Sequence, residues 1–486
     1  MSLINISNLT FSYDSSFDYI FKDVSFQIDT DWKLGFTGRN GRGKTTFFRL
    51  LMGEYEYQGS ITASTEFSYF PYDVQDKSLN TIEIVDSIYT GYELWELQRE
   101  LSLLDTDYDI LYRPFSTLSN GEQTKVLLAI LFLKENNFLL IDEPTNHLDR
   151  RSRQIVSDYL KSKKGFILVS HDRAFLDNCI DHILSINKTN IEIQKGNFSS
   201  WYKNKEMQDA YELSENEKLK KEISKLSASA RQATGWSYQV EASKQGAFDK
   251  GYIGHKSAKM MKRAKSIEAR RNHAITEKSK LLKNIENADE LTILPLDYHK
   301  ETLISCQNIS IYYGEKEVTK DVSFSVCRGD RLALYGKNGS GKSSILKLLI
   351  GDEISYNGTL TIGSNLIISY ICQDTSLLKG NLTDYAKQHD IDESLFKTVL
   401  RKLDFSRNQF EKDIREFSGG QKKKVLLAAS LCQRAHLYIW DEPLNYIDII
   451  SRMQIEDLIL KFQPTMIFVE HDSSFVDKIA TKTVEL

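Results

Sequence analysis

The sequence predicts an α/β fold that occurs twice in tandem, with a long α-helical hairpin linker between the two copies. Three observations support this prediction: a glycine-rich motif recurs in the second half, a short apolar run precedes each copy of the motif, and a charged segment of helical character separates the copies. A chain of 486 residues is long enough for two or three domains.

The composition is that of a globular protein, with 41% hydrophobic and 27% charged residues. The net charge is -4, so binding to nucleic acid would need a local basic surface. The five cysteines are scattered without a CxxC pair, which argues against a zinc knuckle or a disulfide framework and suits a reducing cytosol. The longest apolar run, Val126–Leu133, is too short to span a bilayer, and the N-terminus has no signal pattern. We therefore expect a cytoplasmic protein.

Four motifs recur in the same order, 298 to 300 residues later in the chain. They are Gly38–Thr46 and Gly336–Ser344, Leu118–Gln123 and Phe417–Lys422, Ile141–Asn146 and Trp440–Asn445, and Ser170–Asp172 and Glu470–Asp472. Four matches at nearly constant spacing indicate an internal duplication. The sequence therefore predicts a first domain over 1–199, a linker over 200–301 and a second domain over 302–486.

Short apolar runs predict the strands of each domain. Continuous apolar runs of this length are expected of central parallel strands that are buried on both faces. The predicted strands are Leu34–Thr37, Phe138–Ile141 and Phe166–Val169 in the first domain, and Arg331–Tyr335, Leu437–Trp440 and Met466–Val469 in the second.

Each glycine-rich motif has the GxxxxGK[ST] pattern of a phosphate-binding loop between a strand and a helix. Its glycines let backbone N–H groups surround phosphates, and the helix N-terminus favours an anion. Lys44 and Lys342 are expected to reach the β- and γ-phosphates, and the hydroxyls of Thr45 and Ser343 to bind Mg²⁺. The predicted cofactors are therefore ATP and Mg²⁺. The nucleotide-binding candidates in the two loops are Gly38, Asn40, Gly41, Gly43, Lys44, Thr45, Thr46, Gly336, Asn338, Gly339, Gly341, Lys342, Ser343 and Ser344.

Two acidic pairs follow predicted central strands. Asp142 and Asp441 end the strands, where a carboxylate is costly without a cation, so Mg²⁺ or its water shell is the natural partner. Glu143 and Glu442 come next and are the candidate general bases, or the residues that position water, for hydrolysis.

His171 and His471 each follow a further apolar strand, where a group that senses the γ-phosphate would stand. A single histidine is more often a satisfied core residue, but its recurrence in both copies favours a catalytic role.

Together these motifs resemble those of the ABC ATPase superfamily: Walker A, signature, Walker B with an adjacent glutamate, and switch histidine, twice and in order. The resemblance implies that the domains form an intramolecular head-to-tail sandwich with two ATP molecules at the interface, in a monomeric protein. One ATP would lie between Gly38–Thr46 and the signature residues Ser418, Gly419 and Gly420. The other would lie between Gly336–Ser344 and the signature residues Ser119, Asn120 and Gly121.

The resemblance also places Tyr13 and Tyr313 where an aromatic ring stacks on adenine. Packing in the core explains these two tyrosines equally well.

Several positions depart from the family pattern. Asn120 replaces a signature glycine, and asparagine tolerates left-handed backbone geometry better than most residues. Gln373 is the expected Q-loop ligand of nucleotide and Mg²⁺ in the second domain. In the first domain Tyr72 aligns with it, and Gln75 is the alternative. Leu444 stands where the family tends to have threonine. We therefore expect the two sites to differ in turnover.

Two ATPases in one chain, with a charged helical linker, resemble the ABC-F group. These proteins act on ribosomes. The resemblance implies that the ATP-bound protein enters the tRNA exit site and moves its linker toward the peptidyl-transferase centre. Its partners would be large-subunit RNA and peptidyl-tRNA, and no transmembrane partner is expected.

The linker composition agrees with such a role. Between His255 and His273 the sequence has seven Lys/Arg residues and one acidic residue, Glu268. This excess of basic charge suits binding to phosphate groups, although a solvated helix face would also explain it. Apolar residues at helical spacing predict that the two arms pair as an antiparallel coil. A tip at about 231–254 carries aromatic residues suited to stacking on RNA bases. The expected RNA-contacting residues are Trp236, Tyr238, Lys244, Phe248, Tyr252, Lys256, Lys259, Lys262 and Arg263.

A long tip, with no arm in the first domain and no C-terminal extension, resembles the antibiotic-resistance ABC-F proteins of Gram-positive bacteria. The closest resemblance is to the Lsa type, through Gly251–Lys265. It implies protection against lincosamides, streptogramin A and pleuromutilins. The alternatives are an ABC-F translation factor that relieves stalled ribosomes without resistance and the ATPase subunit of a drug exporter.

Overall fold

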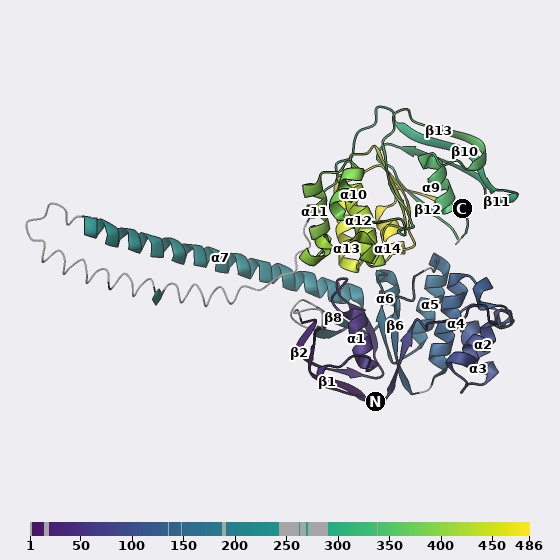
Figure 1. Ribbon diagram of the computed structural model, residues 1–486, viewed down its shortest axis with the longest axis horizontal. Coiled ribbons are helices and arrows are strands. Elements are labelled where there is room, and N and C mark those ends of the chain that lie inside the picture. Colours follow the sequence, from purple (N-terminus) through teal and green to yellow (C-terminus); the bar gives the residue numbers. More distant parts are fainter. Residues whose placement is uncertain are drawn as a thin grey trace, which may run out of the picture. The chain divides into compact units, whose positions relative to one another are not determined.

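The computed structural model describes residues 2–13, 19–134, 136–146, 148–186, 191–242, 262, 269–270, 290–337 and 339–486, with the backbone only over 226–242. The chain forms two compact units, one of Met1–Trp201 with Ala288–Leu486 and one of Tyr202–Asn287. The first unit contains both predicted domains. Figure 1 shows the first domain in purple to blue and the second in green to yellow.

The elements of the first domain follow the predicted order of strands and helices. They are β1 (Leu3–Phe11), β2 (Phe21–Asp29), β3 (Lys33–Thr37), α1 (Lys44–Leu51), β4 (Gln58–Thr62), β5 (Glu66–Phe70), α2 (Thr81–Ile88), α3 (Leu94–Leu103), η1 (Tyr108–Tyr112), η2 (Phe115–Thr117), α4 (Asn120–Leu133), β6 (Asn137–Asp142), α5 (Arg150–Ser162), β7 (Phe166–Val169), α6 (Arg173–Cys179), β8 (His182–Ile186) and β9 (Ile191–Lys195).

The second domain repeats this order. Its elements are β10 (Thr302–Tyr313), β11 (Lys316–Cys327), β12 (Arg331–Tyr335), α9 (Lys342–Ile350), β13 (Ser355–Ile362), β14 (Ile368–Ile371), α10 (Leu382–Gln388), α11 (Glu393–Lys402), η3 (Arg407–Glu411), η4 (Ile414–Glu416), α12 (Gly419–Cys432), β15 (Leu437–Asp441), α13 (Ile449–Phe462), β16 (Met466–Val469), α14 (Ser473–Ile479) and β17 (Lys482–Glu485). The predicted fold class of two tandem α/β domains is thus confirmed.

Each domain contains a central sheet and a smaller antiparallel sheet. The central sheets have the orders β5-β6-β7-β3-β8-β9 and β14-β15-β16-β12-β17, and all neighbours are parallel except β8 and β9. The predicted central strands are buried, as continuous apolar runs require. Because β3, β6 and β7 are neighbours, the loops at their carboxyl ends meet at one edge of the sheet. These loops carry the phosphate loop, the acidic pair and the histidine.

The duplication extends to strained positions of the small sheets. The first strand of each sheet has a left-handed asparagine, Asn8 (φ 52°) or Asn308 (φ 51°), at a shift in register. A glycine of the facing strand packs against it, and a Cβ atom on Gly59 or Gly358 would lie within 2.5 Å of the asparagine carbonyl oxygen. Both copies therefore need glycine there, because a side chain would collide with backbone.

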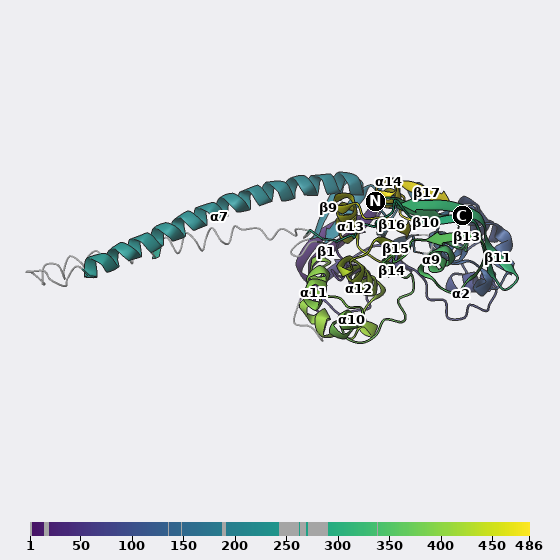
Figure 2. The same cartoon turned by 90° about the horizontal axis from the view of Figure 1, so that it is seen from above.

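The linker begins with one continuous helix, α7 (Phe198–Ala242), which is roughly 68 Å long at 1.5 Å per residue. Figure 2 shows it as a single helix. The helix extends past Arg231, the predicted start of the tip, so the backbone at Trp236 and Tyr238 is helical. The segment has no proline, and its one glycine, Gly235, costs only about 1 kcal/mol in a helix.

Most of the other linker predictions lie outside the described residues. Among the predicted RNA contacts, Lys262 is described and is exposed. The coil pairing, the rest of the tip and the remaining expected contacts, Lys244, Phe248, Tyr252, Lys256, Lys259 and Arg263, fall outside them.

The end of the predicted linker packs against the second domain. Leu291 and Ile293 are buried in its core, and the Leu296 N–H donates to the Ala435 carbonyl at 2.8 Å. The compact unit that holds the two α/β domains therefore resumes at Ala288, ahead of Thr302.

Candidate active sites between the two domains

A cavity of about 620 Å³ separates the first phosphate loop from the second signature. It is lined by Tyr13, Ile20, Asn40, Gly41, Gly43, Lys44, Thr45, Thr46, Tyr69, Pro71, Asp142, Glu143, Val169, His171, Ser418, Gly419, Gly420 and Tyr446. The Asn40 amide donates to the Tyr446 carbonyl at 2.8 Å across the domain boundary. This cavity has the composition expected for the first ATP site.

A second cavity, of about 410 Å³, lies between the second phosphate loop and the first signature. It is lined by Ser119, Asn120, Arg153, Val318, Gly339, Gly341, Lys342, Ser343, Ser344, Gln373, Glu442, Asn445 and His471. Tyr313 is not among its described lining residues. It is half exposed, and its hydroxyl donates to Ser344 at 3.2 Å. By contrast, Tyr13 lines the first cavity and its hydroxyl lies 2.8 Å from that of Thr46. Asn338 lies outside the described residues.

Both phosphate loops contain glycines in the left-handed backbone conformation, which glycine adopts without steric cost. Gly43 and Gly341 cap the following helices at φ 93° and 89°, and a Cβ atom on either would lie within 2.5 Å of a neighbouring side chain. The Lys44 ammonium donates to the carbonyls of Gly38 at 2.7 Å and Arg39 at 3.3 Å. Burial lowers the pKa of Lys44 because it disfavours the charged ammonium, and an anion bound in the loop would offset this cost.

The strand-end aspartates lie beside the phosphate-loop hydroxyls. Thr45 donates to Asp142 Oδ2 at 3.0 Å, and Tyr69 donates to the same oxygen at 3.2 Å. In the second domain Asp441 is 1% exposed, and its Oδ1 accepts no hydrogen bond from the described residues. Burial raises the pKa of both aspartates. A buried carboxylate beside a hydroxyl is an oxygen donor set suited to Mg²⁺, so the residues present fit ATP with this ion.

The predicted glutamate–histidine pairs are adjacent. His171 Nε2 lies 3.2 Å from Glu143 Oε1, and His471 Nε2 lies 3.4 Å from Glu442 Oε1. Both glutamates have left-handed backbone, φ 51° and 47°, and their N–H groups donate to the valine that ends the next strand. Strained backbone held by its surroundings is frequent at functional sites.

The first pair has fewer polar partners, and Glu143 Oε1 accepts no hydrogen bond from the described residues. Burial, followed by the charge of Asp142, raises the pKa of Glu143 to about 8. Burial, followed by the charge of Lys44, lowers the pKa of His171 well below its usual range. Both effects favour the neutral forms.

The second pair has more polar partners. Glu442 Oε2 accepts hydrogen bonds from Gln373 at 2.8 Å and from Asn445 at 2.6 Å. Burial alone would raise the pKa of Glu442, but His471, Gln373 and the charge of Lys423 outweigh it and lower the pKa. The two sites therefore differ in the electrostatics of the acidic residue.

The first domain lacks an equivalent of Gln373 at its cavity. Tyr72 lies under Lys134, whose ammonium is 5.2 Å from the ring centroid, and Gln75 donates to Asp73 at 2.8 Å. Neither residue is among the described lining of the first cavity. Tyr69, three residues earlier than Tyr72, lines this cavity and contacts Asp142. Sequence comparison alone could have singled out Tyr69, because Tyr370 recurs at the matching place.

The signature asparagine is tolerated for another reason than expected. Asn120 is the first residue of helix α4, behind the N-cap Ser119, and it has no left-handed backbone. Its counterpart Gly419 is also helical, and a Cβ atom there would lie 3.6 Å from the nearest atom. Glycine is needed at the next position, because a Cβ atom on Gly420 would lie 2.5 Å from the Tyr446 carbonyl oxygen.

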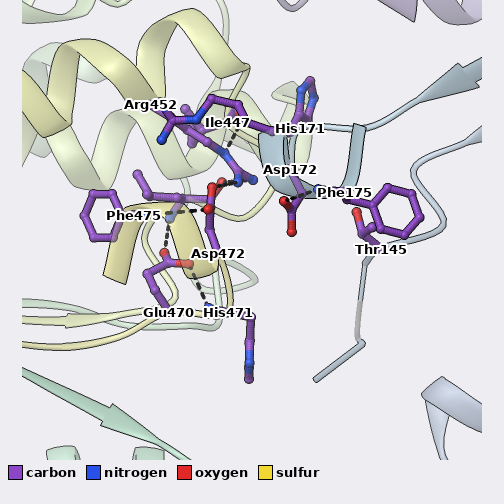
Figure 3. Close-up of polar contacts among 12 residues, drawn as sticks. Thr145, His171, Asp172, Phe175, Ile447, Arg452, Glu470, His471, Asp472 and Phe475 are labelled. Carbon is purple, nitrogen blue, oxygen red and sulfur yellow. Dashed lines mark hydrogen bonds and ion pairs between the residues drawn. The ribbon is translucent and has the colours of Figure 1, made fainter. Parts of the chain in front are cut away.

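Leu444 stands where the first domain has Thr145, and this difference is accompanied by a second one nearby. In the first domain the hydroxyls of Thr145 and Ser170 lie 3.1 Å apart. In the second domain Glu470 replaces the serine, and its carboxylate accepts the Leu444 N–H at 2.8 Å. Figure 3 shows Glu470 beside His471 and Asp472 in this region. The two substitutions compensate each other across the loop.

A double-mutant cycle tests this compensation. Glu470→Ser should destabilise the second domain by about 1–3 kcal/mol, because the buried Leu444 N–H loses its acceptor. Adding Leu444→Thr should recover about 1 kcal/mol or more by restoring the hydroxyl pair of the first domain. Urea unfolding of both single variants and the double variant measures the coupling. Additive effects would show that the two positions are independent.

The comparisons with known proteins agree with this geometry. The ABC transporter family model matches residues 21–146 and 319–445. The "Ribosome protection protein VmlR" of Bacillus subtilis is 27% identical over 98% of this chain and 85% of its own length. The "ATP-binding protein Uup" of Buchnera aphidicola is 28% identical (99% and 80%), and the "Energy-dependent translational throttle protein EttA" of Haemophilus influenzae 25% (96% and 89%).

Among solved structures, an archaeal ribosome recycling factor, aABCE1, in complex with the ribosomal stalk protein aP1 has the same fold. Its TM-score is 0.66 at 19% identity, over 98% of this chain and 87% of the other. None of the helices in the described part of this chain is long and apolar enough to cross a membrane.

Proposed function

The chain belongs to the ABC transporter family and is an ATPase, and from this premise we propose that it is an ABC-F protein that protects the ribosome from antibiotics. The observation that carries the proposal is a match along nearly the whole chain, linker included, to a relative named as a ribosome protection protein. A relative named as a translational throttle protein supports action in translation. The protein would work in the cytoplasm.

The residues at the two cavities have the following proposed roles. Lys44 and Lys342 hold the β- and γ-phosphates, while the Thr45 and Ser343 hydroxyls and the two aspartates hold Mg²⁺. Ser418–Gly420 would contact the nucleotide from across the first cavity, and Ser119–Gly121 from across the second. Hydrolysis of the bound ATP would then release the protein from the ribosome.

Glu143 and Glu442 would be the general bases, or the residues that position water, for hydrolysis. His171 and His471 keep the glutamates in place through the contacts of 3.2 and 3.4 Å. Gln373 joins Glu442 in the second site.

The linker would deliver the effect of ATP binding. Closure of the two domains on ATP fits the protein to the tRNA exit site, and the linker displaces the acceptor end of peptidyl-tRNA. This displacement dislodges drugs of the lincosamide, streptogramin A and pleuromutilin type, as the resemblance to Lsa-type proteins implies. The predicted aromatic and basic linker residues would contact the ribosomal RNA.

Replacing Glu143 and Glu442 together by glutamine tests the ribosome model. The double variant should lose about 10²-fold or more of its ATP turnover, because no side chain can accept the proton, while ATP binding persists. It should therefore remain with ribosomes in the pellet when they are sedimented with ATP, whereas the wild type dissociates. Glu54→Gln, at an exposed site in the first domain, is the control. A double variant that sediments free of ribosomes would contradict the model.

Drug susceptibility separates resistance from the alternatives. A sensitive host that expresses the chain should gain resistance, and substitutions at Trp236, Phe248 or Tyr252 should reduce it. An ordinary translation factor would leave susceptibility unchanged. An exporter subunit would lower the amount of drug held by the cell.

A further inference from the structure

Lys423, in helix α12, is a buried lysine with a specific pair of acceptors. Its side chain is 2% exposed, and its ammonium donates to the carbonyl of Cys372 at 3.0 Å and to that of Asp441 at 3.4 Å. Cys372 directly follows β14, and Asp441 ends β15, which is the parallel neighbour of β14. One ammonium therefore joins the carboxyl ends of two adjacent strands.

Two catalytic candidates begin directly after these carbonyls. Gln373 follows Cys372 and Glu442 follows Asp441, and the two side chains share the hydrogen bond of 2.8 Å. The Glu442 N–H also donates to Val469 at 3.0 Å, so its peptide group is held on both sides. A hydrogen bond from an ammonium is about twice as strong as one between neutral groups. Lys423 thus restrains the backbone directly before Gln373 and Glu442, and this backbone sets the direction of both side chains.

The first domain has a different arrangement at the same places. Thr124 occupies the position of Lys423, and its hydroxyl donates to Asn120 of its own helix at 2.9 Å. Pro71 and Tyr72 occupy the positions of Cys372 and Gln373, and Tyr72 lies under Lys134. The first domain therefore has a threonine in place of the lysine that joins the two strand ends in the second domain.

The charges around Lys423 also have to be considered. Burial lowers the pKa of Lys423, while the carboxylates of Glu470, Asp441 and Glu442 favour its charged form. A lysine that only balanced these charges would affect folding, and both ATP sites would lose activity together. A positioning role predicts a loss confined mainly to one site.

We propose that Lys423 is a positioning residue for ATP hydrolysis in the second site, and that this site is the faster of the two. Lys423 holds Gln373 and Glu442 so that the glutamate faces the attacking water. Glu442 takes the proton of that water as its oxygen bonds to the γ-phosphorus and the bond from this phosphorus to the ADP oxygen breaks. The products are ADP and phosphate. The inference rests on the ATPase activity and is independent of any ribosome target.

The test uses the full-length chain with Glu143→Gln, which removes the acidic residue of the first site. In this background Lys423→Thr, which copies the first domain, should lower kcat at least tenfold, with KM for ATP changed by less than about twofold. Lys423→Arg should keep at least a third of kcat, because a guanidinium can donate to both carbonyls. Lys412→Thr, at an exposed site of the second domain outside the motifs, is the control.

The same substitution in a Glu442→Gln background separates positioning from folding. There the remaining turnover belongs to the first site, and Lys423→Thr should reduce it by less than threefold. Equal losses in both backgrounds, or a kcat unchanged by Lys423→Thr in the Glu143→Gln background, would overturn the proposal. If Lys423→Thr does not fold, Lys423→Gln, which keeps one N–H donor, is assayed in both backgrounds with the same criteria. Failure of these results would leave the ribosome model standing, because sedimentation tests that model separately.

Discussion

Replacing Asp448 by alanine should destabilise the second domain by about 4 kcal/mol, the largest loss that we expect from a single substitution. Asp448 is 0% exposed and accepts from the Lys424 ammonium at 2.9 Å. It also caps helix α13 by accepting the Ser451 N–H at 2.9 Å. The substitution would leave a buried ammonium without its carboxylate and a helix without its N-cap.

The matched control is Asp149→Ala in the first domain. Asp149 caps α5 in the same way, accepting the Ser152 N–H at 2.8 Å, but it is only partly buried. Loss of the cap should cost about 1 kcal/mol. Thermal and urea unfolding of both variants measure the difference. Similar losses for the two variants would show that the ion pair with Lys424 adds little.

Stability should also depend on pH through Asp448. Burial alone would raise its pKa, but the charge and hydrogen bond of Lys424 outweigh burial and lower the pKa far below the usual value. A carboxyl with a lowered folded-state pKa stabilises the fold above its unfolded pKa of about 4, and this contribution is lost as the pH falls through the folded value. The stability difference between wild type and Asp448→Ala should therefore be full at pH 7 and shrink below about pH 4.

Replacing Arg173 by alanine should cost about 3 kcal/mol, because it breaks a buried ion pair between the two domains. Arg173 of α6 donates to Glu456 of α13, whose side chain is 0% exposed. Among the described residues, Glu456 would keep Lys478 at 3.1 Å, which is 42% exposed. The loss should appear as a lower midpoint of thermal unfolding.

Arg150→Ala provides the control for this second prediction. Arg150 also pairs across the domains, with Asp477 at 3.9 Å, but both side chains are more than 60% exposed. An exposed pair of this kind contributes about 0–1 kcal/mol. A loss for Arg173→Ala no larger than that for Arg150→Ala would mean that Glu456 finds other compensation.

The positions that correspond to Arg173 and Glu456 in the other half are Ser473 and Ser157. These serines line a cavity of about 550 Å³ between the domains, together with His471 and Gly336 of the second site. The Arg173–Glu456 ion pair thus joins the two domains on the side of the interface that carries His171 and the first site. On the corresponding side, at the second site, the cavity takes the place of an ion pair. The two halves of the interface are chemically unequal.

Local motifs explain why much of the fold and of the sites could be predicted. A phosphate loop such as Gly38–Thr46 is contiguous and has its own backbone requirements, so its pattern survives in the sequence. Strands such as Phe138–Ile141 are recognisable because burial on both faces demands an apolar run. Recurrence in the second half strengthened each of these interpretations.

Other features depend on residues far apart in the chain. The choice between Tyr72 and Gln75 could not be made from spacing, because it depends on where the side chains lie: Tyr72 lies under Lys134, and Gln75 donates to Asp73. Helix α7 continues through Gly235, since one glycine does not end a helix without proline. Asn120 was interpreted through left-handed geometry, whereas the signature loop places it in the first helical turn.

The sequence by itself determined the two α/β domains, the phosphate loops and the order of the catalytic candidates, because each depends on short patterns whose physical requirements are local. Only the tertiary structure decided that Lys423 joins the ends of two strands, that Glu470 compensates for Leu444, and that Arg173 meets Glu456 in one half of the interface. These contacts bring together residues up to 283 positions apart, and their energies come from burial, which a linear pattern does not record.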